Sequence, residues 1–269
     1  MNLPPLDSEY PLAEEQVQRY LRDGHILLRG VCTPSEVSAY RPVISDAVRR
    51  LSRETRPVGE RDTYGKAFLQ VSNIWESDEG VRAFTLARRF AGIAARLMRV
   101  RGVRIYHDQA LFKEPGGGYT PWHQDQFYWP LDTPNTITMW MPMVHAPLET
   151  GALAFASGSH RDGFLANIGI SDDSERHFSE EVARRGYPMA CGELGPGDAT
   201  FHAGWTLHKA GGNARDYMRE VMTIIWHEDG ARVTEPPNSN QANDLATWLP
   251  GLKPGDLAAS PKNPLVHNS

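Results

Sequence analysis

The stretch VRIYHDQALFKEPGGGYTPWHQD, residues 103–125, marks the point at which the pattern of the sequence changes. From Val103 onward, short runs rich in β-branched and aromatic residues alternate with turns built from Gly, Pro and Asn, which is typical of antiparallel strands. This pattern predicts a mainly β fold, a sandwich or jelly roll with helices packed outside it. The expected strands are 103–112, 136–144, 152–156, 198–203 and 219–227.

Helical periodicity dominates the first hundred residues. Apolar residues at helical spacing predict a helix that ends at Gly24, and a short apolar run predicts a strand over 25–28. The sequence Thr33-Pro34-Ser35-Glu36 has the form of a helix start, with Thr33 as the cap. A further helix is expected over about 78–100.

We therefore expect a single domain, with helices before the β core and an irregular tail after it. Long polar loops inside a compact domain are often functional lids. The expected parts are residues 1–269 for the domain, about 1–100 for the helical part and about 101–230 for the jelly-roll core. The candidate lids are the loops 54–66 and 161–190 and the tail near Trp248-Leu249-Pro250.

The composition of the 269 residues excludes several classes of protein. Hydrophobic residues make up 40% and charged residues 23%, which suits a globular chain with a buried core. The formal net charge of -5 argues against nucleic acid as a partner, because phosphate binding needs clustered Lys and Arg. No apolar run is long enough to span a membrane, and no signal peptide is visible, so we expect a cytoplasmic protein with reduced cysteines. No pattern indicates an oligomeric state.

A candidate metal site begins with His123 and Asp125. On an extended strand, side chains at i and i+2 point to the same face, so this imidazole and this carboxylate can reach one point. A His-x-Asp pair also occurs by chance on surface strands, so a third ligand is needed. His208, which precedes a glycine-rich turn, is the favoured third ligand. His202 is the rival ligand, with packing or support of the site as its alternative role.

Two histidines and one carboxylate form the facial triad that is typical of non-haem Fe(II) oxygenases. Such a triad leaves three positions open, of which a 2-oxo acid can fill two and dioxygen the last. In a hairpin centred near Asn213, Arg219 would fall almost opposite His208. Because a buried dianion needs a cation, Arg219 is the candidate partner for the distal carboxylate of the 2-oxo acid. Its alternative role is a surface salt bridge.

Together these features resemble the phytanoyl-CoA dioxygenase family of Fe(II)- and 2-oxoglutarate-dependent oxygenases. The resemblance extends from about Gln70 to His227 and rests on a combination of motifs rather than on one. The motifs are Lys113-Glu114-Pro115-Gly116, Trp122-His123-Gln124-Asp125, Ile137-Thr138-Met139-Trp140, Thr150-Gly151-Ala152-Leu153, Ser157-Gly158-Ser159-His160, Gly197-Asp198, and His208 with Asn213 and Arg219.

The resemblance implies a double-stranded β-helix, a jelly-roll relative of the cupins, in agreement with the strand pattern. It also implies Fe(II) as the metal and 2-oxoglutarate and O2 as co-substrates. The implied iron ligands are His123, Asp125 and His208, and the implied anchor of the distal carboxylate is Arg219. Further contacts to the co-substrate are implied for Gln124, Trp140, Gln109 and Gln70.

The implied reaction is the oxidation, most simply the hydroxylation, of a small molecule with release of succinate and CO2. Aromatic residues crowd the iron-binding segment and suit an apolar or ring-containing metabolite or natural-product intermediate, unless they only fill the barrel. No basic cluster is present for the phosphates of coenzyme A. The aromatic residues are Tyr119, Trp122, Phe127, Tyr128 and Trp129.

Three alternatives stay open at the level of sequence. The same chemistry can end in desaturation, epimerisation, cyclisation or ring opening. A cupin-like Zn or Mn enzyme could use the triad without 2-oxoglutarate, and Arg219 would then be dispensable. A jelly-roll binding protein without catalysis would form no succinate with any substrate.

Overall fold

Two antiparallel sheets form the body of the protein in the computed structural model, which describes residues 3–269. The larger sheet has seven strands in the order β1-β8-β5-β10-β3-β11, with β2 also paired to β3, and the smaller has the order β4-β9-β6-β7. The larger sheet contains β1 (His25–Leu28), β2 (Leu69–Ser72), β3 (Gly102–Phe112), β5 (Thr136–Pro142), β8 (Ala199–Ala203), β10 (Val221–Glu228) and β11 (Leu265–Asn268). The smaller contains β4 (Thr120–His123), β6 (Leu153–Ala156), β7 (Met189–Cys191) and β9 (His208–Ala210).

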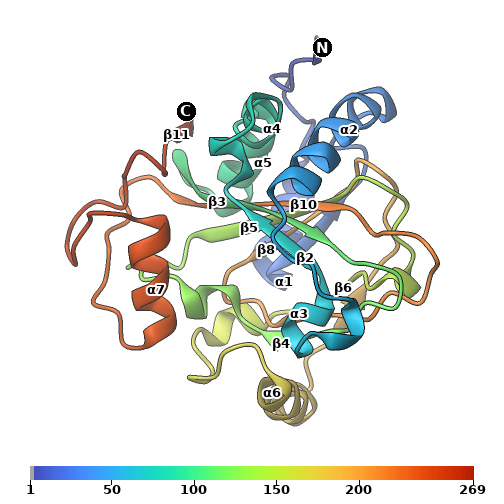
Figure 1. Ribbon diagram of the computed structural model, residues 1–269. Helices are drawn as coiled ribbons and strands as arrows, with labels where there is room; N and C mark the ends of the chain where they lie inside the picture. Colours follow the sequence, from blue (N-terminus) through green and yellow to red (C-terminus); the bar gives the residue numbers. More distant parts are fainter. Residues whose placement is uncertain (1–2) are drawn as a thin grey trace.

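Four helices cover the outer face of the larger sheet, as the position of α2, α4 and α5 beside the strands in Figure 1 illustrates. They are α1 (Glu14–Asp23), α2 (Pro34–Leu51), α4 (Glu79–Thr85) and α5 (Arg88–Met98). Alternation along each strand separates the two faces. On β5, Ile137 and Met139 pack into the core beneath the helices, whereas Thr138 and Trp140 face the cavity between the sheets. The side chains of β10 alternate in the same way.

Local sequence signals fix the helix ends. At the start of α2, the Thr33 side chain accepts a hydrogen bond from the Glu36 main-chain N–H, and the Glu36 carboxylate accepts one from Thr33 in return. Gly24 ends α1 with φ of 76°, where a Cβ would lie 2.3 Å from the His160 ring. The helix expected over 78–100 is two helices, because the chain leaves helical geometry between α4 and α5 at Ala87.

Two segments expected to be irregular contain regular structure. The loop 161–190 includes α6 (Asp172–Arg185), and the C-terminal tail includes α7 (Ser239–Trp248) and β11. Phe178 of α6 is buried in a small apolar cluster with Trp122, which explains why this polar helix stays on the sheet. The loop 54–66 holds the start of the short helix α3 (Thr63–Ala67).

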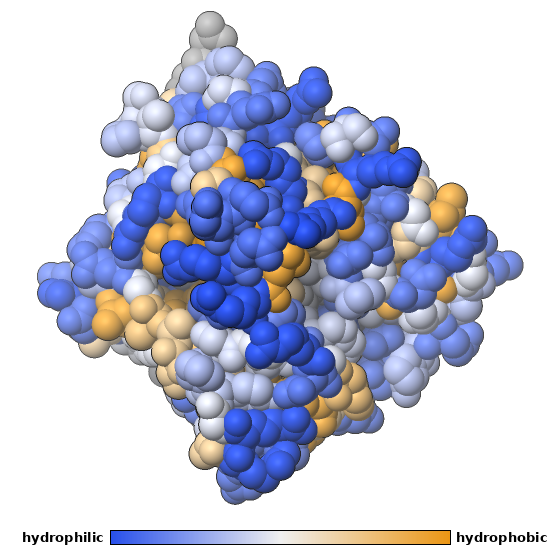
Figure 2. Space-filling model, turned by 180° about the vertical axis from the view of Figure 1, so that it is seen from behind, coloured by the Kyte–Doolittle hydropathy of each residue, from blue (hydrophilic) through white to orange (hydrophobic). Residues whose placement is uncertain are grey.

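Hydrophilic side chains dominate the face of the molecule seen in Figure 2, where hydrophobic residues lie scattered among them. No helix within residues 3–269 combines the length and the apolar character needed to cross a membrane. The substantial apolar surfaces lie inside, beneath the helices and around the cavity.

Candidate active site

A cavity of about 450 Å³ lies between the two sheets and gathers most of the predicted site residues. Both sheets contribute side chains to it, and so do α3 and α7. The predicted residues that line it are His123, Asp125, His208, Arg219, Trp140, Gln109 and Gln70. Gln124 is the one predicted site residue that does not line this cavity.

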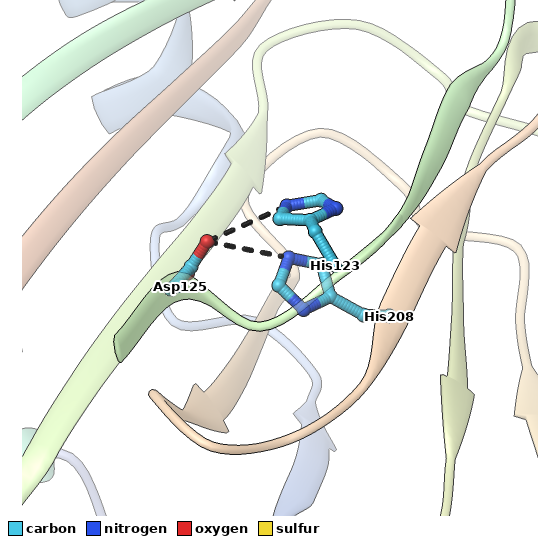
Figure 3. A group of neighbouring side chains, drawn as sticks. All are labelled: His123, Asp125 and His208. Atoms are coloured by element: carbon cyan, nitrogen blue, oxygen red, sulfur yellow. Dashed lines mark ion pairs between the residues drawn. The ribbon is translucent and has the colours of Figure 1, made fainter. Parts of the chain in front are cut away.

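His123, Asp125 and His208 come together although they are distant in the sequence, as Figure 3 shows. His123 ends β4 and pairs in register with His208, which begins β9. Asp125 follows at the start of a 3-10 turn, Asp125–Tyr128, so its carboxylate turns toward the two rings. One Asp125 oxygen, Oδ1, lies 3.5 Å from His123 Nε2 and 3.6 Å from His208 Nε2. One ligand atom from each residue falls within 4.8 Å of the others.

The hydrogen bonds of the two rings fix which nitrogen faces the centre. His123 Nδ1 donates to the Pro121 carbonyl at 2.8 Å, and His208 Nδ1 donates to the Thr206 carbonyl at 2.9 Å. Each Nε2 therefore keeps its lone pair toward Asp125. Burial also lowers the pKa of His208 well below its ordinary value, so its imidazole is neutral, as a metal ligand must be.

The carboxylate of Asp125 is held in one orientation. Its second oxygen, Oδ2, accepts hydrogen bonds from the Thr138 hydroxyl at 2.9 Å and from His202 Nε2 at 3.2 Å. Burial alone would raise the pKa of Asp125, but the neighbouring imidazoles outweigh it and hold the pKa well below the ordinary value. An ionised carboxylate with one oxygen free of hydrogen bonds, beside the Nε2 atoms of two imidazoles, is a donor set that fits a ferrous ion with open positions.

His202 lies beside the triad and not within it. Its side chain is buried on β8 and contacts Asp125 through Nε2, while its Nδ1 has no hydrogen-bond partner among residues 3–269. The group of ligand atoms within 4.8 Å contains His208 and leaves His202 out. The structure thus favours the supporting role over the role of rival ligand.

Arg219 presents a buried guanidinium to the cavity without an acidic partner. Its Nη atoms donate to the carbonyls of Gly151 at 2.5 Å and Leu111 at 3.3 Å, and its Nε has no partner among the described residues. Its guanidinium lies 5.2 Å from the centre of the Trp140 ring. Burial lowers the pKa of Arg219 to about 9, which leaves it protonated near neutral pH. An uncompensated buried cation of this kind fits the carboxylate of a bound acid.

The route by which Arg219 and His208 meet differs from the predicted hairpin. The segment after His208 leaves the smaller sheet, and β10 begins in the larger sheet, so the two strands do not pair. The main chain of Arg219 instead forms a bridge with Lys113 next to β3. The two side chains reach one cavity from opposite sheets, and the hairpin prediction was wrong about how they do so.

Lys113 is a buried amine beside Arg219 and belongs to the motif Lys113-Glu114-Pro115-Gly116. Its ammonium donates to the Gly118 carbonyl at 2.5 Å and lies 5.8 Å from the Phe68 ring centre. Burial, together with the charge of Arg219, lowers its pKa to about 6. Lys113 does not line the cavity, so it supports the loop before β4 from behind.

Gln124 is tied to the main chain away from the cavity. Its amide nitrogen donates to the carbonyls of Gly163 and Trp205 at 2.8 and 2.7 Å, and its oxygen accepts from Leu165 N at 3.1 Å. These three bonds use both amide hydrogens and one lone pair of the oxygen, and they hold the side chain outside the cavity lining. Gln70 does line the cavity, where its oxygen accepts a hydrogen bond from the Tyr64 hydroxyl at 2.9 Å.

The wall of the cavity away from the triad contains residues that the sequence did not single out. His107 stacks against Trp248, with ring centres 4.6 Å apart, and Asp244 of α7 lies beside them. We call this the substrate-side wall; it consists of Tyr64, His107, Tyr128, Ile170, Asp244 and Trp248. Each of the three predicted lids contributes to it: Tyr64, Ile170 and Trp248.

Of the five aromatic residues predicted near the substrate, Tyr128 and Trp129 line the cavity. Trp122 packs with α6, and Tyr119 is 40% exposed, with its hydroxyl donating to Asp172 at 2.6 Å. Phe127 is buried behind the cavity lining. These three side chains do not line the cavity, because alternation and the 3-10 turn direct them away from it, which the alternative role considered for this aromatic set allows.

Comparison with known proteins gives an independent view of the same chain. A family model described as phytanoyl-CoA dioxygenase matches residues 20–221. The ectoine dioxygenase of Streptomyces anulatus is 23% identical over 84% of this chain and 82% of its own length. The phytanoyl-CoA dioxygenase domain-containing protein 1 of Danio rerio is 21% identical over 87% of this chain and 96% of its own.

Solved structures agree. The non-heme alpha-ketoglutarate-dependent carbocyclase of nogalamycin biosynthesis superposes with a TM-score of 0.78 at 25% identity, covering 95% of this chain and 96% of that one. The epimerase of the same pathway shares the fold, with a TM-score of 0.76 at 24% identity and coverage of 95% and 98%. These matches confirm the expected jelly roll, the cofactor Fe(II) and the co-substrate 2-oxoglutarate. The chain belongs to the phytanoyl-CoA dioxygenase family of non-haem iron, 2-oxoglutarate-dependent dioxygenases.

Proposed function

We propose that His123, Asp125 and His208 hold Fe(II), and that Arg219 binds the distal carboxylate of 2-oxoglutarate. One observation carries this assignment: three ligand atoms within 4.8 Å of one another share a cavity with the buried guanidinium of Arg219, which has no acidic partner among residues 3–269. Fe(II) with one aspartate carries one net positive charge, and 2-oxoglutarate brings two negative charges. One buried arginine then neutralises the site.

The residues around the iron have separate tasks in this proposal. When bound, the iron and 2-oxoglutarate supply an oxidation that is coupled to decarboxylation of the co-substrate to succinate and CO2. His123 and His208 keep Nε2 available because their Nδ1 atoms are engaged by carbonyls. Thr138 and His202 occupy the second oxygen of Asp125 and so favour a single carboxylate contact to the metal. Trp140 covers the guanidinium of Arg219 and keeps water from it.

The substrate in this proposal is a small, largely apolar and ring-containing metabolite or natural-product intermediate. The cavity of about 450 Å³ is of the size that holds a small molecule, and Tyr64, Tyr128 and Trp248 give it aromatic walls. We propose hydroxylation as the outcome. Two proteins with the same fold are a carbocyclase and an epimerase, so this fold supports reactions other than hydroxylation. In this proposal the position of the bound substrate decides which product forms.

The proposed setting is the cytoplasm, with free small molecules as partners and neither nucleic acid nor a membrane. The formal net charge of -5 supports this setting. So does the position of the cavity between the sheets, which suits a ligand that diffuses in from solution.

Binding of 2-oxoglutarate to the Fe(II)-loaded protein, measured by anaerobic calorimetry, tests the assignment. Arg219→Met should weaken 2-oxoglutarate roughly 10-fold to 100-fold while Fe(II) binding stays intact, because one charge-assisted contact is lost. Arg215→Met is the matched control, since the Arg215 side chain is exposed, lies outside the cavity lining and pairs with Glu149 at 3.8 Å. Succinate release by the wild type should require both Fe(II) and 2-oxoglutarate. Unchanged 2-oxoglutarate affinity in Arg219→Met would refute the assignment.

A further inference from the structure

The substrate-side wall contains one carboxyl group, that of Asp244, which forms no ion pair with any of the residues 3–269. Asp244 is 9% exposed on α7. The Tyr106 hydroxyl donates to Asp244 Oδ2 at 3.2 Å. Burial raises its pKa to about 7, against the opposing effects of Tyr106 and Trp248. A carboxyl group with so little compensation is costly unless a ligand engages it.

A second buried carboxyl shows what a purely structural aspartate looks like in this protein. Asp108, on β3, accepts hydrogen bonds from the main-chain N–H groups of Ile74 and Trp75 at 2.8 and 3.1 Å and from the Thr85 hydroxyl at 2.8 Å. It does not line the cavity. Asp244 has no main-chain donor among residues 3–269: it accepts from the Tyr106 hydroxyl and lies beside the Trp248 indole, and it does line the cavity. The contrast indicates that Asp244 is not there to hold the fold together.

The neighbours of Asp244 in this part of the cavity include an acceptor, the ring of His107, and the neutral amides of Asn240 and Asn243. His107 Nδ1 lies 3.4 Å from the Asp108 carbonyl, and burial lowers its pKa to about 4, so the ring is neutral with Nε2 as an acceptor. Arg219 is the one Lys or Arg among the residues that line the cavity, and the proposed function assigns it to 2-oxoglutarate. An anionic substrate would therefore find no cation of its own.

The helix that carries Asp244 is held firmly over the cavity. Asn238 caps α7 by accepting from the Gln241 N–H at 3.0 Å, and the Gln241 side chain donates to the Phe127 carbonyl beside the iron-binding turn at 3.1 Å. Leu249 at the end of the helix packs on Trp129. Figure 1 shows α7 at the edge of the strands, separate from the helices on the larger sheet. Asp244 and Trp248, one turn apart, face the cavity together.

We propose that Asp244 is the recognition subsite for a hydrogen-bond donor, a protonated amine or a hydroxyl, on a ring-containing substrate that stacks between Tyr64, Tyr128 and Trp248. The proposal rests on the proposed function, because it leaves Arg219 to the co-substrate. It narrows the substrate class to cationic or neutral molecules and excludes carboxylates and phosphonates.

Three ring compounds of one shape test this directly: 2-phenylethylamine, 2-phenylethanol and phenylacetate. Each is titrated into the anaerobic protein loaded with Fe(II) and 2-oxoglutarate at about pH 8, where the carboxyl is mainly ionised. Quenching of tryptophan fluorescence reports binding without turnover, because Trp129, Trp140 and Trp248 line the cavity. The amine or the alcohol should bind at least about 10-fold more tightly than phenylacetate.

Asp244→Asn should weaken the preferred compound about 10-fold and leave phenylacetate unchanged or improved. Glu235→Gln is the matched control, since it removes an exposed negative charge near α7 that does not line the cavity. Phenylacetate binding as tightly as the amine and the alcohol to the wild type would overturn the proposal, whatever the variant does. So would equal affinity of Asp244→Asn and wild type for the preferred compound. If the Fe(II)-loaded wild type does not bind 2-oxoglutarate at all, that result counts against the proposed function and not against the role of Asp244.

Discussion

The two walls of the cavity are built in different ways. The iron-side wall, made of His123, Asp125, His208 and Arg219, stands on strands or at their ends, and hydrogen bonds to the main chain or to neighbouring side chains fix each group. The substrate-side wall takes five of its six residues from α3, the 3-10 turn, the loop before α6 and α7, and one, His107, from β3. One wall thus depends on the sheets and the other on segments added around them.

This difference suggests that the two walls have different tasks. The iron-side wall serves the reaction that the family shares, and the substrate-side wall serves the choice of substrate in this protein. Residues on paired strands are held in register and can keep a metal geometry while the rest of the chain varies. Residues on peripheral helices and loops can change without disturbing the sheets, and such segments commonly carry specificity. We therefore expect variants of the iron-side wall to abolish binding of metal or co-substrate. Variants of the substrate-side wall should change which molecule binds.

Removal of one of the three proposed iron ligands is expected to have the largest effect. His208→Ala should weaken Fe(II) binding by at least about 100-fold, because a single ligand carries a large share of the binding free energy. The measurement is anaerobic Fe(II) titration monitored by calorimetry. Asp244→Asn is the comparison variant, and its Fe(II) affinity should equal that of the wild type. If His208→Ala binds Fe(II) as tightly as the wild type, His208 is not a ligand and the proposed difference between the two walls is wrong.

Gln124→Ala should act on stability and not on the co-substrate. The buried amide makes three hydrogen bonds to the main chain, so its loss should cost roughly 2 kcal/mol of unfolding free energy. Urea unfolding of the two proteins measures this difference. The Kd for 2-oxoglutarate should not change. A large rise in that Kd without a loss of stability would restore the co-substrate role that the resemblance implies.

His202→Phe should loosen the iron-side wall without removing a ligand. The substitution keeps an aromatic ring but deletes the donor to Asp125 Oδ2. Loss of such a supporting contact weakens metal binding roughly 10-fold, near the low end of its usual effect, since Thr138 remains. Fe(II) affinity and thermal stability are measured together. A loss as large as that of His208→Ala would show that His202 is itself a ligand.

The smallest expected effect is the pH dependence of stability caused by Asp244. Burial raises its folded-state pKa to about 7, far above that of an unfolded aspartate, so the folded state retains a proton that the unfolded state releases. Unfolding free energy is therefore lost as pH rises toward and through the folded pKa, by about 1 kcal/mol between about pH 6 and pH 8. Urea unfolding of wild type and Asp244→Asn at both pH values isolates this contribution: between pH 6 and pH 8 the wild type should lose about 1 kcal/mol relative to Asp244→Asn. Parallel pH dependence in the two proteins would contradict the raised pKa.

The residues of the iron-side wall could be predicted from the sequence, because they lie in recognisable local motifs. The motif Trp122-His123-Gln124-Asp125 and the pair His208 and Arg219 follow strand and turn signals, and the family resemblance ties them together. The strand pattern also predicted the sheets and the helical layer. The crossing from β9 to β10 between sheets was missed, because a Gly-Gly-Asn turn reads as a hairpin when only neighbouring residues are considered.

Most of the substrate-side wall could not be predicted from the sequence. Asp244 lies on a polar helix in a tail rich in Pro and Asn, and no spacing links it to His107 on β3. Its significance arises from burial and from the lack of a partner, which only tertiary packing creates. The placement of Trp248 near a lid was predicted, but the helix that presents it was not.

A crystal structure of the protein soaked anaerobically with Fe(II) and 2-oxoglutarate tests the central claim most directly. We predict the iron at about 2.0–2.2 Å from His123 Nε2, His208 Nε2 and Asp125 Oδ1. The distal carboxylate of 2-oxoglutarate should form a bidentate pair with Arg219, and His202 should remain outside the coordination sphere. Iron bound through His202, or 2-oxoglutarate seated away from Arg219, would contradict the account.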